Sequence, residues 1–302
     1  MFSALAGIFL NILVPVFTLV GLGTVAGRRL NLETRTLTRF AYYLLTPAFV
    51  LDAMSRATIQ ADLALRMIGY TISVHLACAA LAYAVARALG RPSQVIAAYI
   101  LIAVFGNVGN FGLPIIQFAY GDEARFSAAL YFVVNTTIAF VVGVSAANWN
   151  SGGKLRAALA VARTPAILAV PPALLINGLS LELPLFASRS IGLLAAALIP
   201  TMLIALGVQL AQVGLPRLSS DILLGSAVRL IGGSLLAFAL ATPFGIGGLE
   251  RGVGILQASM PAAVLASIIA LEYDLLPQFV VATVFVSTLL SVVSLTIILA
   301  LL

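Results

Sequence analysis

The sequence predicts an all-α membrane protein of ten transmembrane helices, built as two inverted five-helix repeats whose helices four and nine are broken and cross. Composition is the first observation, since hydrophobic residues make up 62% of the 302 residues and charged residues only 9%. With a mean hydropathy of +1.15, the chain lies outside the range of soluble globular proteins. The other two observations are long apolar stretches along the whole chain and two stretches interrupted at matching places.

A membrane-spanning helix needs about 20 mostly apolar residues, and ten such stretches can be followed in order. They cover about residues 4–27, 39–55, 66–87, 93–120, 126–147, 164–181, 191–213, 222–244, 251–271 and 277–302. The first stretch has no basic region before it, so it is interpreted as a span and not as a signal peptide. The polar stretch from Asn148 to Arg156 is too short for a soluble domain.

The net charge is +6, but the basic residues lie mostly in short loops, so the charge does not indicate a nucleic-acid partner. Loops after odd-numbered spans hold ten basic residues, and loops after even-numbered spans hold five. Because cytoplasmic loops are enriched in Lys and Arg, this bias predicts cytoplasmic odd loops and both termini outside. We expect a multi-pass protein of the cell membrane, in a bacterium the inner membrane.

The fourth span is interrupted at its centre. Between Gly106 and Pro114 it carries three glycines, two asparagines and a proline. Proline lacks an amide donor and glycine loosens a helix, so Gly109, Gly112 and Pro114 are expected to break the span. A break at this depth is tolerated where the freed backbone is buried in protein or lines a wet cavity.

The same interruptions recur half a chain later. Pro200 lies 153 residues after Pro47, and Pro261 lies 147 residues after Pro114. In the pair Pro114 and Pro261, a carboxamide lies four residues before each proline: Asn110 before Pro114, and Gln257 before Pro261. Five spans per half is an odd number, so residues 151–302 would form a copy of residues 1–150 inserted from the opposite side. Paired interrupted segments in inverted halves are typical of secondary transporters.

These motifs resemble the auxin efflux carrier family, which includes plant auxin exporters and bacterial carriers of small organic acids. The resemblance covers essentially the whole chain. The residues that carry it are 107–114 (NVGNFGLP), 256–261 (LQASMP), 272–274 (EYD), 199–200 (IP) and 206–210 (LGVQL). Plant members have a long central loop, whereas this chain has only residues 148–163, as bacterial members do.

The resemblance implies an architecture like that of sodium/proton antiporters or bile-acid symporters. Spans one, two, six and seven, with Pro47 and Pro200, would form a scaffold that often makes a homodimer. Spans three to five and eight to ten would form a moving transport subdomain. The residue that matches Asn107 contacts the substrate carboxylate in the plant members, which are hydrophobic at the position of Asn110.

Half-helices that start near Phe111 and Met260 would point free amides and positive dipole ends at the crossing, which suits a carboxylate without a basic residue. The alternative is that the carboxamides only satisfy backbone groups freed by the break. Spacing favours Asn110 as the partner of Gln257. The candidate substrate-binding residues are Asn107, Asn110, Gln257, Ser259 and Asn135; Asn135 could equally make an interhelical hydrogen bond near Tyr131.

Ionisable residues inside spans are functional candidates, here for ion or proton coupling. Asp52 could reach the outer interface, and Arg229 could extend to the cytoplasmic edge. His75, the only histidine, is either a core residue or a proton relay. Glu272 is expected in a loop.

We expect a secondary carrier of a small organic anion or weak carboxylic acid (auxin-like, malate-like or malonate-like) with an elevator-type mechanism. The alternatives are an ion channel and a sodium- or proton-coupled carrier of a non-carboxylate solute. No nucleotide, metal or cofactor motif is present, and one histidine and one cysteine leave little for an intramembrane enzyme. The expected partners are the substrate and the lipid bilayer.

Overall fold

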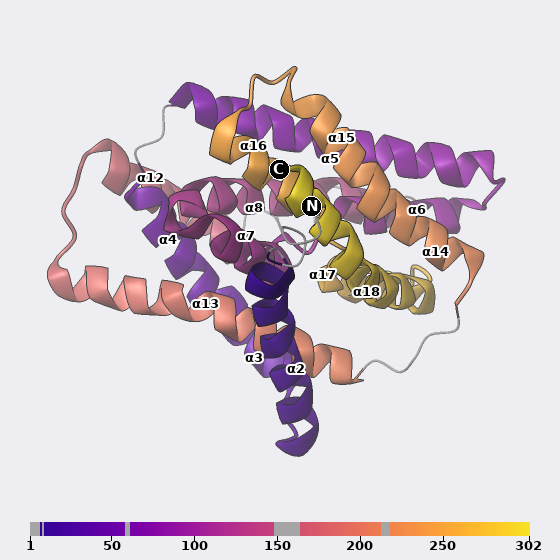
Figure 1. Ribbon diagram of the computed structural model, residues 1–302, viewed down its shortest axis with the longest axis horizontal. Helices are drawn as coiled ribbons and strands as arrows, with labels where there is room; N and C mark the ends of the chain where they lie inside the picture. Colours follow the sequence, from indigo (N-terminus) through magenta and orange to yellow (C-terminus); the bar gives the residue numbers. More distant parts are fainter. Residues whose placement is uncertain (1–6, 8, 58–60, 148–163, 213–217) are drawn as a thin grey trace.

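The computed structural model describes residues 7, 9–57, 61–147, 164–212 and 218–302 and is almost entirely helical (Figure 1). Within these residues the extended pairing is limited to an isolated antiparallel bridge between Gly106 and Ala262. The predicted central loop, residues 148–163, lies outside the described residues, as do Arg217 and the first six residues. The all-helical prediction is confirmed.

The helical elements lie in the predicted apolar stretches, although Val108–Gly143 forms one helical stretch through parts of the predicted fourth and fifth spans. Those before the central loop are η1 (Phe9–Leu13), α2 (Val14–Arg29), α3 (Thr34–Phe40), η2 (Ala41–Leu45), α4 (Thr46–Ser55), α5 (Ala61–Ala88), α6 (Ser93–Val104), η3 (Val108–Gly112), α7 (Leu113–Tyr120), η4 (Gly121–Ala124), α8 (Arg125–Ala139), η5 (Phe140–Val144) and α9 (Ser145–Ala147). Those after it are α11 (Pro165–Leu168), α12 (Val170–Gly178), α13 (Leu185–Gln212), α14 (Ser220–Ala227), η6 (Val228–Gly232), α15 (Gly233–Ala241), α16 (Gly248–Ala258), α17 (Val264–Glu272) and α18 (Pro277–Leu301).

Six helical stretches of the described chain are long and apolar enough to cross a membrane. They are Phe9–Arg29, Ala61–Ala88, Val108–Gly143, Leu185–Gln212, Ser220–Ala241 and Pro277–Leu301. Ser93–Val104 and Pro165–Gly178 are shorter apolar helices. The protein is therefore multi-pass, whereas the count of ten spans and their inverted repeat stay predictions.

Three prolines are preceded by a wide helical turn. The π-helical segments η1, η2 and η3 each end two residues before a proline, namely Pro15, Pro47 and Pro114. A proline ring clashes with the carbonyl group four residues earlier in an α-helix, and a π turn moves that carbonyl away. The prolines thus sit in the first turn of α2, α4 and α7 without ending the helical path.

Helices α2 and α13 cross at very close range, α13 being the long helix in the lower part of Figure 1. A methyl group on Gly23 would lie 2.4 Å from the carbonyl oxygen of Ile204, and one on Gly207 would lie 2.0 Å from that of Val20. The hydroxyl of Thr24 donates to the carbonyl of Gly207 across 3.1 Å. Each glycine therefore lets the other helix approach at a point where any side chain would collide.

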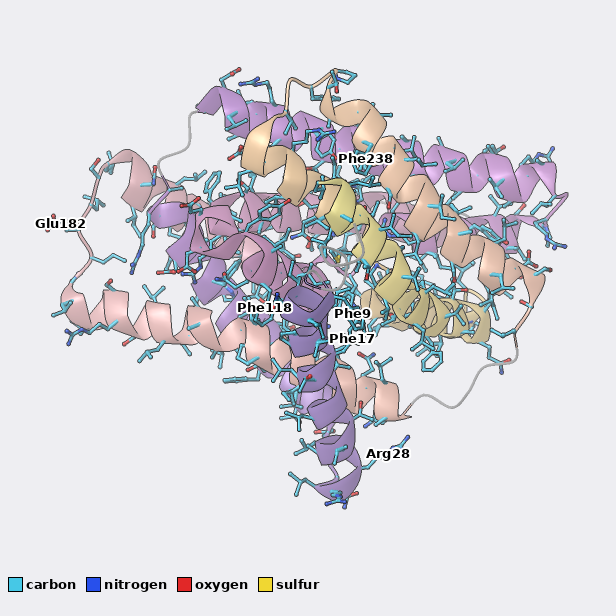
Figure 2. All side chains as sticks on the ribbon, in the orientation of Figure 1. Phe9, Phe17, Arg28, Phe118, Glu182 and Phe238 are labelled. Carbon is cyan, nitrogen blue, oxygen red and sulfur yellow. The ribbon has the colours of Figure 1, made fainter. Side chains whose placement is uncertain are left out.

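Polar contacts divide the described helices into two groups. Among the described hydrogen bonds and ion pairs between different spans, apart from those of Thr164, one set joins α2, α3, α4, α12 and α13 to one another. The other set joins α5, α6, α8, α14, η6, α15, α16 and α18, with the residues between α16 and α17, to one another. In the described residues one ion pair, between Asp52 of α4 and Arg125 of α8, joins the groups. Arg125 also lies over the ring of Phe49 of α4, 5.7 Å from the ring centre. Apolar side chains meet between the groups as well, as where Phe17 of α2 meets Phe111 of η3 (Phe17 is labelled in Figure 2).

Candidate functional site at the crossing of two broken helices

The two breaks meet and pair through their backbones. The helix α6 ends at Val104 and η3 begins at Val108, while α16 ends at Ala258 and α17 begins at Val264. The amide of Asn107 donates to the carbonyl of Pro261 across 2.8 Å, and the amide of Ala263 donates to the carbonyl of Phe105 across 2.7 Å. Four helix ends therefore converge on one point, two amino ends and two carboxyl ends.

The break in the fourth span lies earlier than the sequence indicated. It occupies residues 105–107, whereas Gly109 and Gly112 lie inside η3 and Pro114 lies in the first turn of α7. The amide of Gly112 donates to the carbonyl of Asn107 across 2.9 Å, which closes the wide turn. Proline lacks an amide N–H, but in the first turn of a helix this N–H would have no partner within the helix. Pro114 therefore shapes the start of α7 and does not itself break the helix.

The two carboxyl ends are occupied by Arg229 of η6. Its guanidinium donates through Nε to the carbonyl of Met260 at 2.8 Å, through Nη1 to that of Ala103 at 2.7 Å and through Nη2 to that of Ala258 at 3.1 Å. The side chain is 1% exposed. The expectation that Arg229 extends to the cytoplasmic edge is therefore wrong: the carbonyls freed at the breaks hold it in the interior.

Two carboxamides at the breaks lack partners in the described part of the chain, one at the amino end of η3 and the other in the last turn of α16, which is a carboxyl end. Asn107 precedes the first residue of η3 and is 4% exposed, yet its Nδ2 has no hydrogen-bond partner among the described residues. Gln257 is 0% exposed, and both polar atoms of its amide lack partners in the same set. An unsatisfied buried polar group costs about 1–3 kcal/mol, so these two amides are candidates to bind a polar ligand.

Asn110 and Gln257, which the spacing matches as counterparts in the two halves of the chain, have different surroundings. Asn110 is partly exposed, and Gln257 instead lies against Gly112, where a methyl group would come within 2.2 Å of Oε1.

Ser259 is held by the protein itself. Its hydroxyl donates to the carbonyl of Ile255 at 2.7 Å and accepts from the hydroxyl of Ser234 at 2.8 Å. It has less free capacity for a ligand than Asn107 or Gln257 has.

Asn135 and His75 lie together. Nε2 of His75 is 2.5 Å from Oδ1 of Asn135, and Nδ1 is 2.7 Å from the carbonyl oxygen of Thr71. A neutral imidazole has one donor; with Nδ1–H given to Thr71, the amide NH2 of Asn135 must turn toward Nε2, whereas a protonated ring donates to both oxygens. Tyr131 stands beside this pair, 5.8 Å from His75 between ring centres, and its buried hydroxyl is unpartnered among the described side chains.

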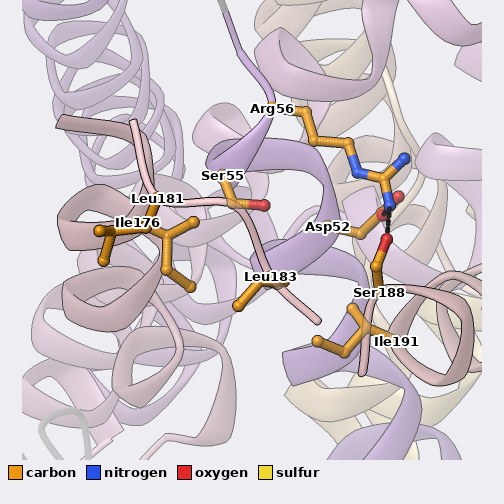
Figure 3. A pocket seen from close by; sticks show the side chains of 8 residues that line it. All are labelled: Asp52, Ser55, Arg56, Ile176, Leu181, Leu183, Ser188 and Ile191. Carbon is orange, nitrogen blue, oxygen red and sulfur yellow. Dashed lines mark hydrogen bonds and ion pairs between the residues drawn. The ribbon is translucent and has the colours of Figure 1, made fainter. Parts of the chain in front are cut away.

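Asp52 is separate from the crossing. It is 5% exposed and forms ion pairs with Arg56 at 3.1 Å and Arg125 at 3.3 Å. A hollow beside it is lined by Asp52, Ser55, Arg56, Ile176, Leu181, Leu183, Ser188 and Ile191 (Figure 3). Figure 3 shows Arg56 between Asp52 and Ser188, to whose hydroxyl Nη2 donates at 3.0 Å. Glu272 is exposed at the end of α17.

Sequence reasoning missed two partners at these sites. The acceptors of Arg229 are backbone carbonyls, which leave no trace in residue identity. Arg125 is one of the five basic residues assigned to loops after even-numbered spans, and residue spacing could not predict that it lies close to Asp52. In the described part of the chain no cluster of three His, Cys, Asp or Glu side chains is placed to hold a metal ion.

Comparison with known proteins identifies the family. The sequence profile described as "Membrane transport protein" (Mem_trans) matches residues 8–157 and 154–299. The chain belongs to this membrane transport protein family. It is the auxin efflux carrier family expected from the motifs, so that resemblance is confirmed.

Relatives of this Mem_trans chain span nearly its full length. A "Putative malonate transporter" of Rhizobium meliloti is 29% identical, and the match covers 95% of this chain and 93% of the relative's chain. An "Uncharacterized transporter" of Methanothermobacter thermautotrophicus is 28% identical and covers 87% of each chain. The protein is thus a membrane transporter, and transport proteins are not an enzyme class.

Proposed function

We propose that this transporter carries a small organic anion with one or two carboxylate groups, bound at the crossing of α6–α7 and α16–α17. The observation that carries the proposal is the unpartnered buried amide of Asn107, next to the amino end of η3. An asparagine in this position usually caps the helix with its side-chain oxygen, but Asn107 makes no such bond. Its NH2 group is free to donate to a carboxylate.

The charges around the crossing support an anion. The amino ends of η3 and α17 present backbone amides and partial positive charge. The carboxyl ends of α6 and α16 are neutralised by Arg229. With the negative poles covered and the positive poles open, the crossing has a net preference for negative charge. The name of the Rhizobium relative adds malonate to the carboxylates worth testing.

The two groups of helices support an elevator-type mechanism. The scaffold would be α2, α3, α4, α12 and α13, and the transport subdomain would be α5 to α8 with α14 to α18. Because polar bonds lie within the groups and apolar side chains meet between them, one group can slide on the other without losing many hydrogen bonds. We further propose the ten-helix inverted repeat, a homodimer through the scaffold, and both termini on the outer side of the cell membrane.

Substitution of Asn107 tests the site. Asn107→Asp keeps the shape but replaces a donor with a carboxylate, and Asn107→Ala removes the donor. Losing a hydrogen bond to a charged group costs about 1.5–3 kcal/mol, so we expect roughly a tenfold or greater loss of affinity. Calorimetric titration of purified protein with malonate, malate and indole acetate measures it.

Asn177→Ala is the matched control. The amide of Asn177 donates to the carbonyls of Ser55 and Ala57, away from the crossing, so affinity should stay as in the wild type. An unchanged affinity in both Asn107 variants would refute the proposed site. Saturable exchange of labelled substrate in proteoliposomes would separate a carrier from a channel.

A further inference from the structure

We infer that Arg229 is a built-in cation that fills the place of a coupling sodium ion, so that transport by this protein needs no sodium. The inference rests on the proposed anion transport at the crossing and adds how its charge is balanced. It makes Arg229 a positioning residue, since three of the five N–H donors of its guanidinium bind backbone carbonyls at the breaks.

The geometry around Arg229 is that of a cation site. Carbonyl oxygens at unwound backbone and at the carboxyl ends of half-helices are the groups that coordinate Na⁺ in transporters with broken helices. Here the three carbonyls of Ala103, Ala258 and Met260 all face one guanidinium at 2.7 to 3.1 Å. These oxygens come from both broken helices, so one positive charge ties the two breaks together.

Charge balance shows that the carbonyls are the partners of Arg229. The chain has ten acidic residues, all within its described part, and the ion pairs there involve Asp52, Asp62 and Asp221 but not Arg229. A buried charge without a counter-ion is costly unless dipoles solvate it. The converging helix ends supply those dipoles, and a mobile cation would be bound by them for the same reason.

The guanidinium lies directly against the backbone of Gly106. A methyl group on Gly106 would lie 2.2 Å from Nη2, so the guanidinium rests directly on the bridge between the breaks. A sodium ion and Arg229 cannot share these oxygens. A protein with arginine in this place carries its cation through every cycle, whereas a coupled carrier must reload one.

The test compares sodium with choline at matched ionic strength. Wild-type protein should exchange labelled malonate equally in both salts, and its melting temperature in detergent should not depend on which is present. Arg229→Ala opens the carbonyl cage. For this variant we expect sodium to raise the melting temperature without substrate, and to raise exchange at least about tenfold over choline.

Arg229→Lys is the conservative control. Its ammonium keeps the charge and three donors, so exchange should remain independent of sodium. A general loss of packing would not create a response to sodium, and that response separates a cation site from a merely structural arginine. Gly106→Ala, which pushes the guanidinium from its place, should show a weaker form of the Arg229→Ala response.

Two results would overturn the inference. One is a wild type whose exchange requires sodium, which can be read even if Arg229→Ala does not fold. The other is a folded Arg229→Ala protein with no response to sodium. Because the melting assay contains no substrate, its outcome is independent of whether Asn107 binds a carboxylate.

Discussion

The side-chain oxygen of Gln257 rests against Gly112, so closely that a methyl group at residue 112 would lie 2.2 Å from it. We therefore expect Gly112→Ala to displace the Gln257 amide from the crossing. Overpacking of a buried site costs about 1–3 kcal/mol, and affinity for malonate should fall with the stability. Calorimetry and thermal melting measure the two effects. Gly192→Ala in α13 is the control, because a methyl group there meets nothing within 4 Å; equal behaviour of the two variants would contradict the prediction.

The crossing of α2 and α13 gives a second prediction. A methyl group on Gly207 would lie 2.0 Å from the carbonyl oxygen of Val20, and neither backbone can yield easily. Gly207→Ala should lower the free energy of unfolding by about 1–3 kcal/mol, seen as a lower melting temperature. Gly21→Ala, on α2 with nothing within 4 Å, should be neutral or stabilise by up to about 1 kcal/mol through helix propensity. A tolerant Gly207→Ala would show that the helices can separate.

The ion pair of Asp52 with Arg125 gives a third prediction, since it joins the two groups of helices. Asp52 is nearly buried and Arg125 is 28% exposed. The coupling energy of the pair should therefore lie above the roughly 0–1 kcal/mol of a surface ion pair and below that of a fully buried one. We expect about 1–2 kcal/mol. A double-mutant cycle with Asp52→Asn and Arg125→Gln, read by melting and by exchange rate, measures it. Under the proposed elevator motion the pair must open, so the variants should also change the exchange rate.

The control for that cycle is Arg56. Its side chain is 61% exposed, and both it and Asp52 belong to the same group of helices. The cycle of Asp52→Asn with Arg56→Gln should show weaker coupling in melting and little effect on exchange. Equal rates in all variants would mean that the pair plays no part in the motion.

His75 gives a fourth prediction. Both ring nitrogens face oxygen atoms of the protein, those of Thr71 and Asn135, so we expect a structural role. His75→Gln should destabilise the protein by about 1–3 kcal/mol through lost buried hydrogen bonds, yet leave the pH profile of substrate exchange unchanged. Exchange measured across pH in liposomes tests this. A profile that flattens in His75→Gln would instead assign His75 to proton coupling.

Sequence reasoning predicted much of the fold because the bilayer imposes few solutions. Apolar length marked the long helical stretches, and Pro261 with the carboxamide of Gln257 marked the second interruption to within a few residues. The first interruption was misplaced because the π turn lets Pro114 follow helix without a break. Arg229 was misplaced because its partners are carbonyl groups that every residue carries, so no spacing of side chains could indicate them.

The bridge between the breaks uses backbone atoms alone, from Phe105, Asn107, Pro261 and Ala263. Pro261 serves as well as any residue there, because the bond needs its carbonyl and not the amide it lacks. Mutation can therefore change the side chains at these positions without cutting the bridge. We expect the crossing to persist in descendants whose substrates have diverged. New specificities would then arise from the side chains around the crossing, because substitutions can change them without breaking the backbone hydrogen bonds.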